Sequence, residues 1–180
     1  LPASVLDETQ GWLAARVRMG FASTDDPHNG DVVMLFGWAD NSSNRLELFY
    51  DPRPGADSWE TRRSASGAGL GVGKPASFAS GDLQTVVFKW TATELGVSVN
   101  GSAFLAAANT TVPTLAAATA RIGSNPYQAN LEFDGDLLWL ASGSGTLTDS
   151  DATTLHNLGN NDPPHPTLPR PPTLTWAANT

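Results

Sequence analysis

The sequence predicts an all-β protein, a two-sheet antiparallel sandwich with one short helix near the C-terminus. Three observations support this fold class. Apolar and polar residues alternate in several segments with the period of two that is typical of half-buried strands. Glycine and proline contribute 17 and 13 of the 180 residues, which suits a chain with many turns. A helical pattern, by contrast, occurs in a single short segment.

The first quarter of the chain predicts three strands. Residues 11–21 alternate clearly, so that the odd-numbered side chains are expected to face the core. Residues 32–38 follow a polar loop at residues 23–31, and their apolar run predicts a strand buried on both faces. Residues 45–50 alternate again. The side chains expected inside are Leu46, Leu48 and Tyr50, and those expected outside are Arg45, Glu47 and Phe49.

Residues 51–75 are expected to be irregular, because glycines and prolines interrupt them repeatedly. A connection of this length in a compact domain is usually a functional loop or a disordered one. The remaining expected strands are residues 83–90, 95–99, 102–106, 121–123 and 131–141. Asn100-Gly101 is a strong signal for a two-residue hairpin turn between two of them.

The helical segment and the end of the chain complete the organisation. Thr148 is a plausible N-cap, acidic residues follow in the first turn, and Gly159 predicts the end of a helix over residues 149–158. Residues 161–180 hold six of the thirteen prolines, which predicts an extended tail or linker. We therefore expect one domain at residues 1–160. Since residue 1 is Leu, we expect a processed product, a fragment or a domain of a larger protein.

The composition excludes several classes of function. The formal net charge is −8 and the isoelectric point is about 4.6, whereas phosphate backbones and anionic lipids attract cationic surfaces. Nucleic acid and membrane are therefore not expected as partners. The sequence contains no cysteine, which excludes disulfides, thiolate metal sites and cysteine nucleophiles.

Three segments in a fixed order resemble a known family. They read SGDLQTVVFKW at residues 80–90 with VSVNG at 97–101, then ARIG at 120–123, then FDGDLLW at 133–139 with GTLTD at 145–149. The set resembles the laminin-G-like, concanavalin A-like lectin and glucanase family over about residues 10–158. The resemblance implies a jelly roll of one convex and one concave sheet. It also implies that the concave face or the loop rim binds glycans or protein partners.

Catalysis is not expected. Glu132, Asp134 and Asp136 are spaced by two, which predicts three carboxylates on one strand face. This spacing resembles the carboxylate motif of retaining β-glucanases of the same fold, where two carboxylates act as nucleophile and acid. The same segment includes the Phe-Asp-Gly that belongs to the end of the family pattern, so the presence of these residues requires no catalytic role. A glycoside hydrolase or polysaccharide lyase is the main enzymatic alternative.

Calcium is the one cofactor that the sequence suggests. Asp25, Asp26 and Asp31 surround Asn29-Gly30 in a loop of hard oxygen ligands, which calcium prefers. A polar turn capped by its own aspartates explains the same residues. In addition, the family pattern ends in Ile-Asp, where this chain has Leu137-Leu138. One acidic position of the family is therefore missing, which weakens the inference of a metal site from the resemblance.

The candidate ligand-binding residues lie in two polar segments. Trp59 stands among polar residues in the segment expected to be a loop, and an exposed tryptophan stacks well on a pyranose ring. Arg62 and Arg63 follow it and can hydrogen-bond to sugar hydroxyls. Asn125 and Tyr127 form a second candidate rim, and Arg45 projects from an outward strand face.

These observations predict a non-catalytic glycan-binding or adhesive module of a secreted or surface protein. The expected partner is a glycan or a cell-surface polysaccharide, and the expected location is extracellular, on the cell surface or in a virion. The alternative is a structural subunit of a larger assembly, whose proline-rich tail docks on neighbouring subunits.

Overall fold

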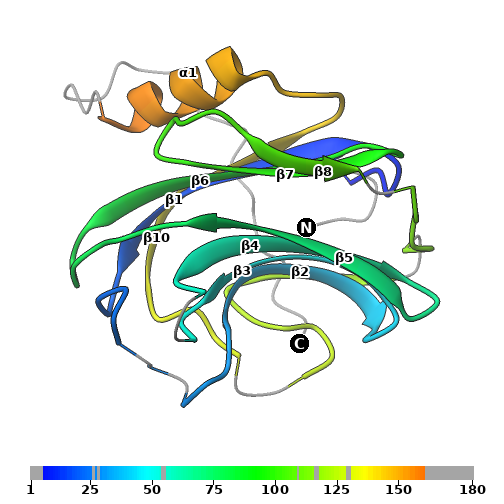
Figure 1. Ribbon diagram of the computed structural model, residues 1–180, viewed down its shortest axis with the longest axis horizontal. Helices are drawn as coiled ribbons and strands as arrows, with labels where there is room; N and C mark the ends of the chain where they lie inside the picture. The colour runs from blue at the N-terminus through cyan, green and yellow to red at the C-terminus, as the bar shows by residue number, and fades with distance from the viewer. Residues whose placement is uncertain are drawn as a thin grey trace, which may run out of the picture.

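The computed structural model describes residues 6–25, 27, 29–53, 56–108, 110–115, 118–128 and 131–160, without the side chains of residues 159 and 160. These residues form a sandwich of two five-stranded antiparallel sheets (Figure 1). The predicted fold class is therefore confirmed. The predicted tail at residues 161–180 lies outside the described residues, and so does Asp26. Among the helices of the described chain, none is long and apolar enough to cross a membrane.

The two sheets have the following strand orders. Sheet A consists of β10 (Gly135–Gly143), β1 (Gly11–Met19), β6 (Leu83–Trp90), β7 (Glu94–Val99) and β8 (Leu105–Ala108). Sheet B consists of β5 (Ala68–Pro75), β4 (Ser58–Ala65), β3 (Asn44–Asp51), β2 (Val33–Asn41) and β9 (Thr119–Ile122). The helix α1 (Asp149–Asn160) lies on the outer side of sheet A (Figure 1).

The core lies between the two sheets and follows the alternation of the strands. In β1 the odd-numbered apolar side chains are buried in the core, and in β3 the same holds for Leu46, Leu48 and Tyr50. Both predictions of the inward face are thus confirmed. Since alternate side chains of a strand point to opposite faces, Arg45, Glu47 and Phe49 lie on the outer side of sheet B.

The start of the helix confirms the prediction from Thr148, whereas its end does not follow the prediction from Gly159, because α1 continues through this residue to Asn160. The backbone N–H of Asp151 donates to Thr148 Oγ1 at 3.3 Å, and the backbone N–H of Thr148 donates to Asp151 Oδ2 at 2.7 Å. This reciprocal arrangement is a capping box, and it satisfies amide donors that the helix itself leaves unpaired. On the inner side of the helix, Ala152 and Leu155 pack against Val87 of sheet A.

The prediction of an irregular segment at residues 51–75 is wrong. The strands β4 and β5 pair along their whole length, from Ser58 opposite Pro75 to Ala65 opposite Ala68. Ser66 and Gly67 form the turn with φ angles of 50° and 82°, which a two-residue hairpin requires. Glycine occupies alternate positions of β5, so the sequence shows no alternation of apolar and polar side chains there, and the strand was not predicted.

These glycines have a structural role on the outer face of β5. A Cβ atom at Gly69 would lie 2.5 Å from Ser64 Oγ, and one at Gly73 would lie 3.0 Å from Ser58 Oγ. The side chains of β4 therefore extend over β5, where larger residues would displace them.

The three carboxylates expected on one strand face are not arranged in that way. Glu132 and Asp134 precede β10, which begins at Gly135, and Asp136 alone lies within the strand. All three residues are exposed, and Asp136 pairs with the exposed Arg18 at 3.5 Å. A pair of carboxylates enclosed in a substrate cleft is therefore not found at this motif.

Candidate functional site

The outer face of sheet B carries most of the polar side chains that were expected to bind a ligand. Strand β3 contributes Arg45, Glu47, Phe49 and Asp51 to this face, and β4 contributes Ser58, Glu60, Arg62 and Ser64. The sheet is curved, and the described part of the chain between β9 and β10 runs along its hollow side (Figure 1). We call residues 123–128 and 131 of this chain the crossing segment.

The crossing segment lies directly against sheet B. A Cβ atom at Gly37 of β2 would lie 2.6 Å from Pro126 Cδ, so that only glycine allows this close approach. Further along, Leu131 is buried with Met34 and Phe49 in a small apolar cluster on the outer face. The segment is therefore held at two points by packing.

Glu47 forms the polar centre of the site. Its side chain is 1% exposed, and a charge buried to this degree requires partners. The Tyr127 hydroxyl donates to Glu47 Oε1 at 2.8 Å, and Arg45 Nη1 lies 3.4 Å from Glu47 Oε2. Arg45 also donates to the Tyr127 hydroxyl. Burial, followed by the negative charge of Glu47, raises the pKa of the Tyr127 phenol, which therefore remains a donor.

Asn125 determines the shape of the crossing segment at this point. Its Oδ1 accepts hydrogen bonds from the backbone N–H groups of Tyr127 at 3.0 Å and Gln128 at 3.1 Å. Its Nδ2 donates to Glu47 Oε1 at 3.4 Å. Asn125 is buried, and its hydrogen bonds hold the backbone of the crossing segment so that Tyr127 lies over Glu47.

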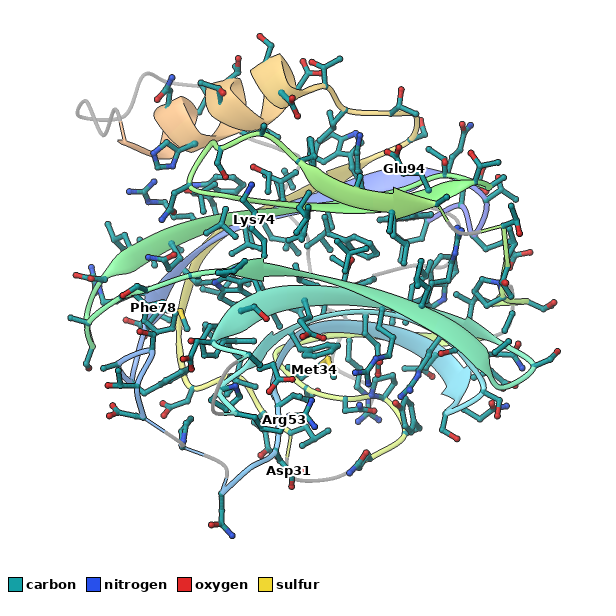
Figure 2. The ribbon with its side chains drawn as sticks, viewed as in Figure 1. Asp31, Met34, Arg53, Lys74, Phe78 and Glu94 are labelled. Carbon is teal, nitrogen blue, oxygen red and sulfur yellow. The ribbon has the colours of Figure 1, made fainter. Side chains whose placement is uncertain are left out.

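A second buried carboxylate, Asp51, holds the loop after β3. It accepts from the backbone N–H of Arg53 at 3.1 Å and from Arg53 Nε at 2.8 Å, and forms an ion pair with the same guanidinium. Burial opposes ionisation of Asp51, but the hydrogen bonds and charge of Arg53 outweigh it and lower the pKa of the carboxyl. Asp31, Met34 and Arg53 lie close together on the outer side of sheet B (Figure 2).

These groups surround a pocket of about 200 Å³. The sheet contributes Met34, Arg45, Glu47, Phe49 and Arg62; the crossing segment contributes Asn125, Tyr127, Gln128 and Leu131; and the adjoining loops contribute Gly30, Asp31, Val32 and Arg53. The floor is thus the curved sheet, and one wall is the crossing segment.

Arg62 differs from the other two arginines of the pocket. Its guanidinium carbon lies 4.8 Å from the centroid of the Phe49 ring. Phe49 is fully buried, so it forms a fixed platform for the guanidinium. Arg45 and Arg53 each pair with a buried carboxylate, whereas Arg62 has neither a hydrogen bond nor an ion pair to any described residue.

Four of the six predicted ligand-binding residues meet at this pocket: Arg45, Arg62, Asn125 and Tyr127. The other two require a correction, because Trp59 and Arg63 are both 0% exposed. In β4 they point between the sheets, where the Trp59 ring lies 5.6 Å from that of Tyr50 and Arg63 donates to the carbonyl oxygen of Thr91. The polar neighbours that suggested an exposed Trp59 belong largely to the opposite face of the strand.

Nine of the thirteen residues that line the pocket were not singled out by the sequence for ligand binding, and the polar or aromatic ones among them include Asp31, Glu47, Phe49 and Arg53. Alternation in β3 already placed Glu47 and Phe49 outside the core. What the sequence did not indicate was the crossing segment, which turns this outer face into an enclosed site.

The calcium site remains a prediction. The Asp25 carboxylate accepts from the backbone N–H of Ala22 at 2.8 Å and so caps its own turn. Asp31 lies at the pocket, and Asp26 is outside the described residues. The part of the chain that the structure describes contains no group of three or more His, Cys, Asp or Glu residues placed to hold a metal ion.

Comparison with known proteins identifies the fold. Neither a protein-family model nor a curated protein matches the sequence. Among solved structures, the CBM40 domain of the IT-sialidase of Ruminococcus gnavus, bound to α2,3-sialyllactose, matches with a TM-score of 0.63 and 14% identity, over 82% of this chain and 83% of that domain. The fold is that of a concanavalin A-like jelly roll.

Two further jelly rolls extend this similarity. Domain 4 of AbnA, a GH43 extracellular arabinanase of Geobacillus stearothermophilus, was solved with arabinotriose and matches with a TM-score of 0.60 and 18% identity, over 84% of this chain and 75% of that domain. Domains LG4-5 of the mouse laminin α1 chain match with a TM-score of 0.60 and 14% identity, over 79% of this chain and 38% of theirs. The resemblance inferred from the sequence motifs is confirmed at the level of the fold.

Proposed function

We propose that this jelly roll is a non-catalytic glycan-binding module whose site is the pocket on the outer face of sheet B. The observation that carries the proposal is the network of Arg45, Glu47 and Tyr127, which fixes polar groups at the wall of a concave pocket. Prearranged hydrogen-bonding groups of this kind select the orientation of a ligand rich in hydroxyl groups.

The size of the pocket suits a single sugar ring. Sites that enclose a whole drug-sized ligand measure roughly 300–1,000 Å³, whereas this pocket measures about 200 Å³. One ring of a glycan would enter it, and the rest of the glycan would extend over the exposed part of the sheet.

The charges of the pocket support binding without catalysis. Glycoside hydrolysis requires a carboxylic acid with a raised pKa beside a second carboxylate. The two buried carboxylates of this face, Glu47 and Asp51, both pair with arginines. For Asp51, the hydrogen bonds and charge of Arg53 outweigh burial and lower the pKa of the carboxyl, and its ionised form cannot donate the proton that departure of the leaving group needs.

The similar folds support the same proposal. Two of these structures contain a bound sugar, sialyllactose in the CBM40 domain and arabinotriose in the arabinanase domain. The arabinanase is extracellular, and we extend the proposal to a module of a secreted or surface protein that attaches it to a glycan or a cell-surface polysaccharide.

A glycan array with a blocking variant tests this function. Gln128 is exposed and lines the pocket, so Gln128→Trp should fill the pocket without disturbing the core. Gln10→Trp is the matched control, since Gln10 is exposed just before β1 in sheet A. We expect the unchanged chain and the control to bind the same glycans, and Gln128→Trp to lose them at an unchanged melting temperature. Equal binding by both variants, or no glycan bound by any form, would contradict the proposal.

A further inference from the structure

Arg62 is the pocket arginine that forms neither a hydrogen bond nor an ion pair with any described residue, although its charge contributes to lowering the pKa of Asp51. Three arginines line the pocket, and two of them have buried carboxylate partners: Glu47 for Arg45 and Asp51 for Arg53. Arg62 contacts the Phe49 ring instead. A guanidinium stays charged at every pH that the fold tolerates, so this pocket retains a positive group that a ligand can meet.

The contact with Phe49 uses no hydrogen-bond donor of Arg62, and no described residue accepts from its N–H groups. A guanidinium stacks through its flat face, whereas its five N–H donors lie in the plane and point outward from the edge. With Phe49 fully buried and Arg62 half-buried, the stacked pair restricts the movement of the guanidinium. A ligand anion would therefore meet a prearranged donor pair.

The local charge balance also differs from that of the whole chain. The protein carries a formal net charge of −8. The lining of the pocket, however, contains three arginines and the two carboxylates of Asp31 and Glu47, and the charge of the third arginine is balanced by Asp51, which pairs with Arg53. The pocket is therefore close to neutral, so that an anionic ligand group meets less repulsion here than over the remaining acidic surface.

We propose that Arg62 binds the carboxylate of an acidic sugar, and that this contact sets the specificity of the module. This inference rests on the proposed function and names its ligand class. A carboxylate is planar, and its two oxygens match the paired donors of a guanidinium edge. The carboxylate can belong to a uronic acid within a polysaccharide or to a sialic acid at the end of a glycan.

Titration calorimetry with matched ligands tests the proposal and separates the two sources. The pairs are trigalacturonate with its methyl ester, and 3′-sialyllactose with lactose. We expect one acidic ligand to bind about 10- to 150-fold more tightly than its neutral counterpart, the range for hydrogen bonds to charged groups. The preferred pair identifies the source of the carboxylate.

Variants of Arg62 then assign the preference to this side chain. Arg62→Met keeps an apolar stem over Phe49 but removes the donors, and should abolish the preference for the acid by weakening the binding of the acidic ligand far more than that of its neutral counterpart. Arg62→Lys keeps the charge without the paired donors and should retain only part of the preference. Arg18→Met is the control, because Arg18 is exposed and pairs with the exposed Asp136 on sheet A.

Each result decides between the two proposals. Equal binding of acidic and neutral ligands, sensitive to Gln128→Trp, overturns the role of Arg62 and leaves the glycan-binding function intact. An equal loss of both ligands in Arg62→Met and Arg62→Lys overturns it as well, because Arg62 would then only support the fold. Absence of binding to every carbohydrate overturns the glycan-binding function, and this inference with it.

Discussion

The Trp59→Ala variant is expected to unfold more readily than the unchanged protein, whereas its folded state is expected to bind the same ligands. The Trp59 side chain is 0% exposed and packs edge-on against Tyr50, at a centroid distance of 5.6 Å and an interplanar angle of 68°. Truncating a buried tryptophan to alanine costs about 3–5 kcal/mol of unfolding free energy. For a domain of this size, that loss lowers the melting temperature by about 6–20 °C.

A conservative variant refines the same prediction. The indole N–H of Trp59 is buried without a hydrogen-bond partner among the described residues, and a buried donor of this kind is itself unfavourable. Trp59→Phe keeps an aromatic ring beside Tyr50 and removes that donor. We expect it to lose less than half of the unfolding free energy that Trp59→Ala loses.

Urea denaturation followed by tryptophan fluorescence and circular dichroism measures both losses, and calorimetry on the folded variants measures ligand affinity. A melting temperature of Trp59→Ala within about 2 °C of the unchanged protein, together with weaker glycan binding, would refute the reasoning. That combination would place the ring at a ligand surface instead of between the sheets.

Three further predictions concern the pocket and the helix. Tyr127→Phe removes the hydroxyl that donates to Glu47, and urea titration should show a loss of about 1–3 kcal/mol because a buried carboxylate loses a donor. Gly37→Ala places a Cβ atom 2.6 Å from Pro126 Cδ, so calorimetry should show weaker ligand binding as the crossing segment moves; unchanged affinity would contradict this. Burial lowers the pKa of His156 below its usual value of 6.5. As the pH decreases, this histidine therefore binds a proton at a higher pH in the unfolded state than in the folded state. The unfolding free energy should be highest above about pH 6.5 and fall as the pH decreases towards the lowered pKa. His156→Gln should flatten this dependence in chemical denaturation at pH 7.5 and 5, and an unchanged slope would speak against it.

The sequence predicted those parts of the fold in which local chemistry and burial agree. Alternation in residues 45–50 assigned both faces of β3 correctly, and Thr148 predicted the start of α1. The hairpin of β4 and β5 was missed because β5 carries glycines where alternation would show polar side chains. In β4, Thr61 and Arg63 face inward beside Trp59 and Ala65, so that half of the buried face of this strand is polar and does not show as an apolar face in the sequence.

The candidate site was predicted only in part for a different reason. Arg45 and Tyr127 are separated by 82 residues along the chain, yet their side chains meet over Glu47. No local pattern in the crossing segment indicates that it lies against a sheet. The decisive feature, the close approach of Pro126 to Gly37, depends on the complete fold.

The pocket combines a rigid floor with a wall that belongs to no strand. The floor residues lie on strands whose backbones are paired with their neighbours in sheet B, so their positions are fixed by the sheet. By contrast, Asn125 and Leu131 anchor the wall, while Gln128 between them is exposed. Diversification of the wall between its two anchors would therefore yield a family of binders on one unchanged scaffold, much as loop libraries do on an antibody framework.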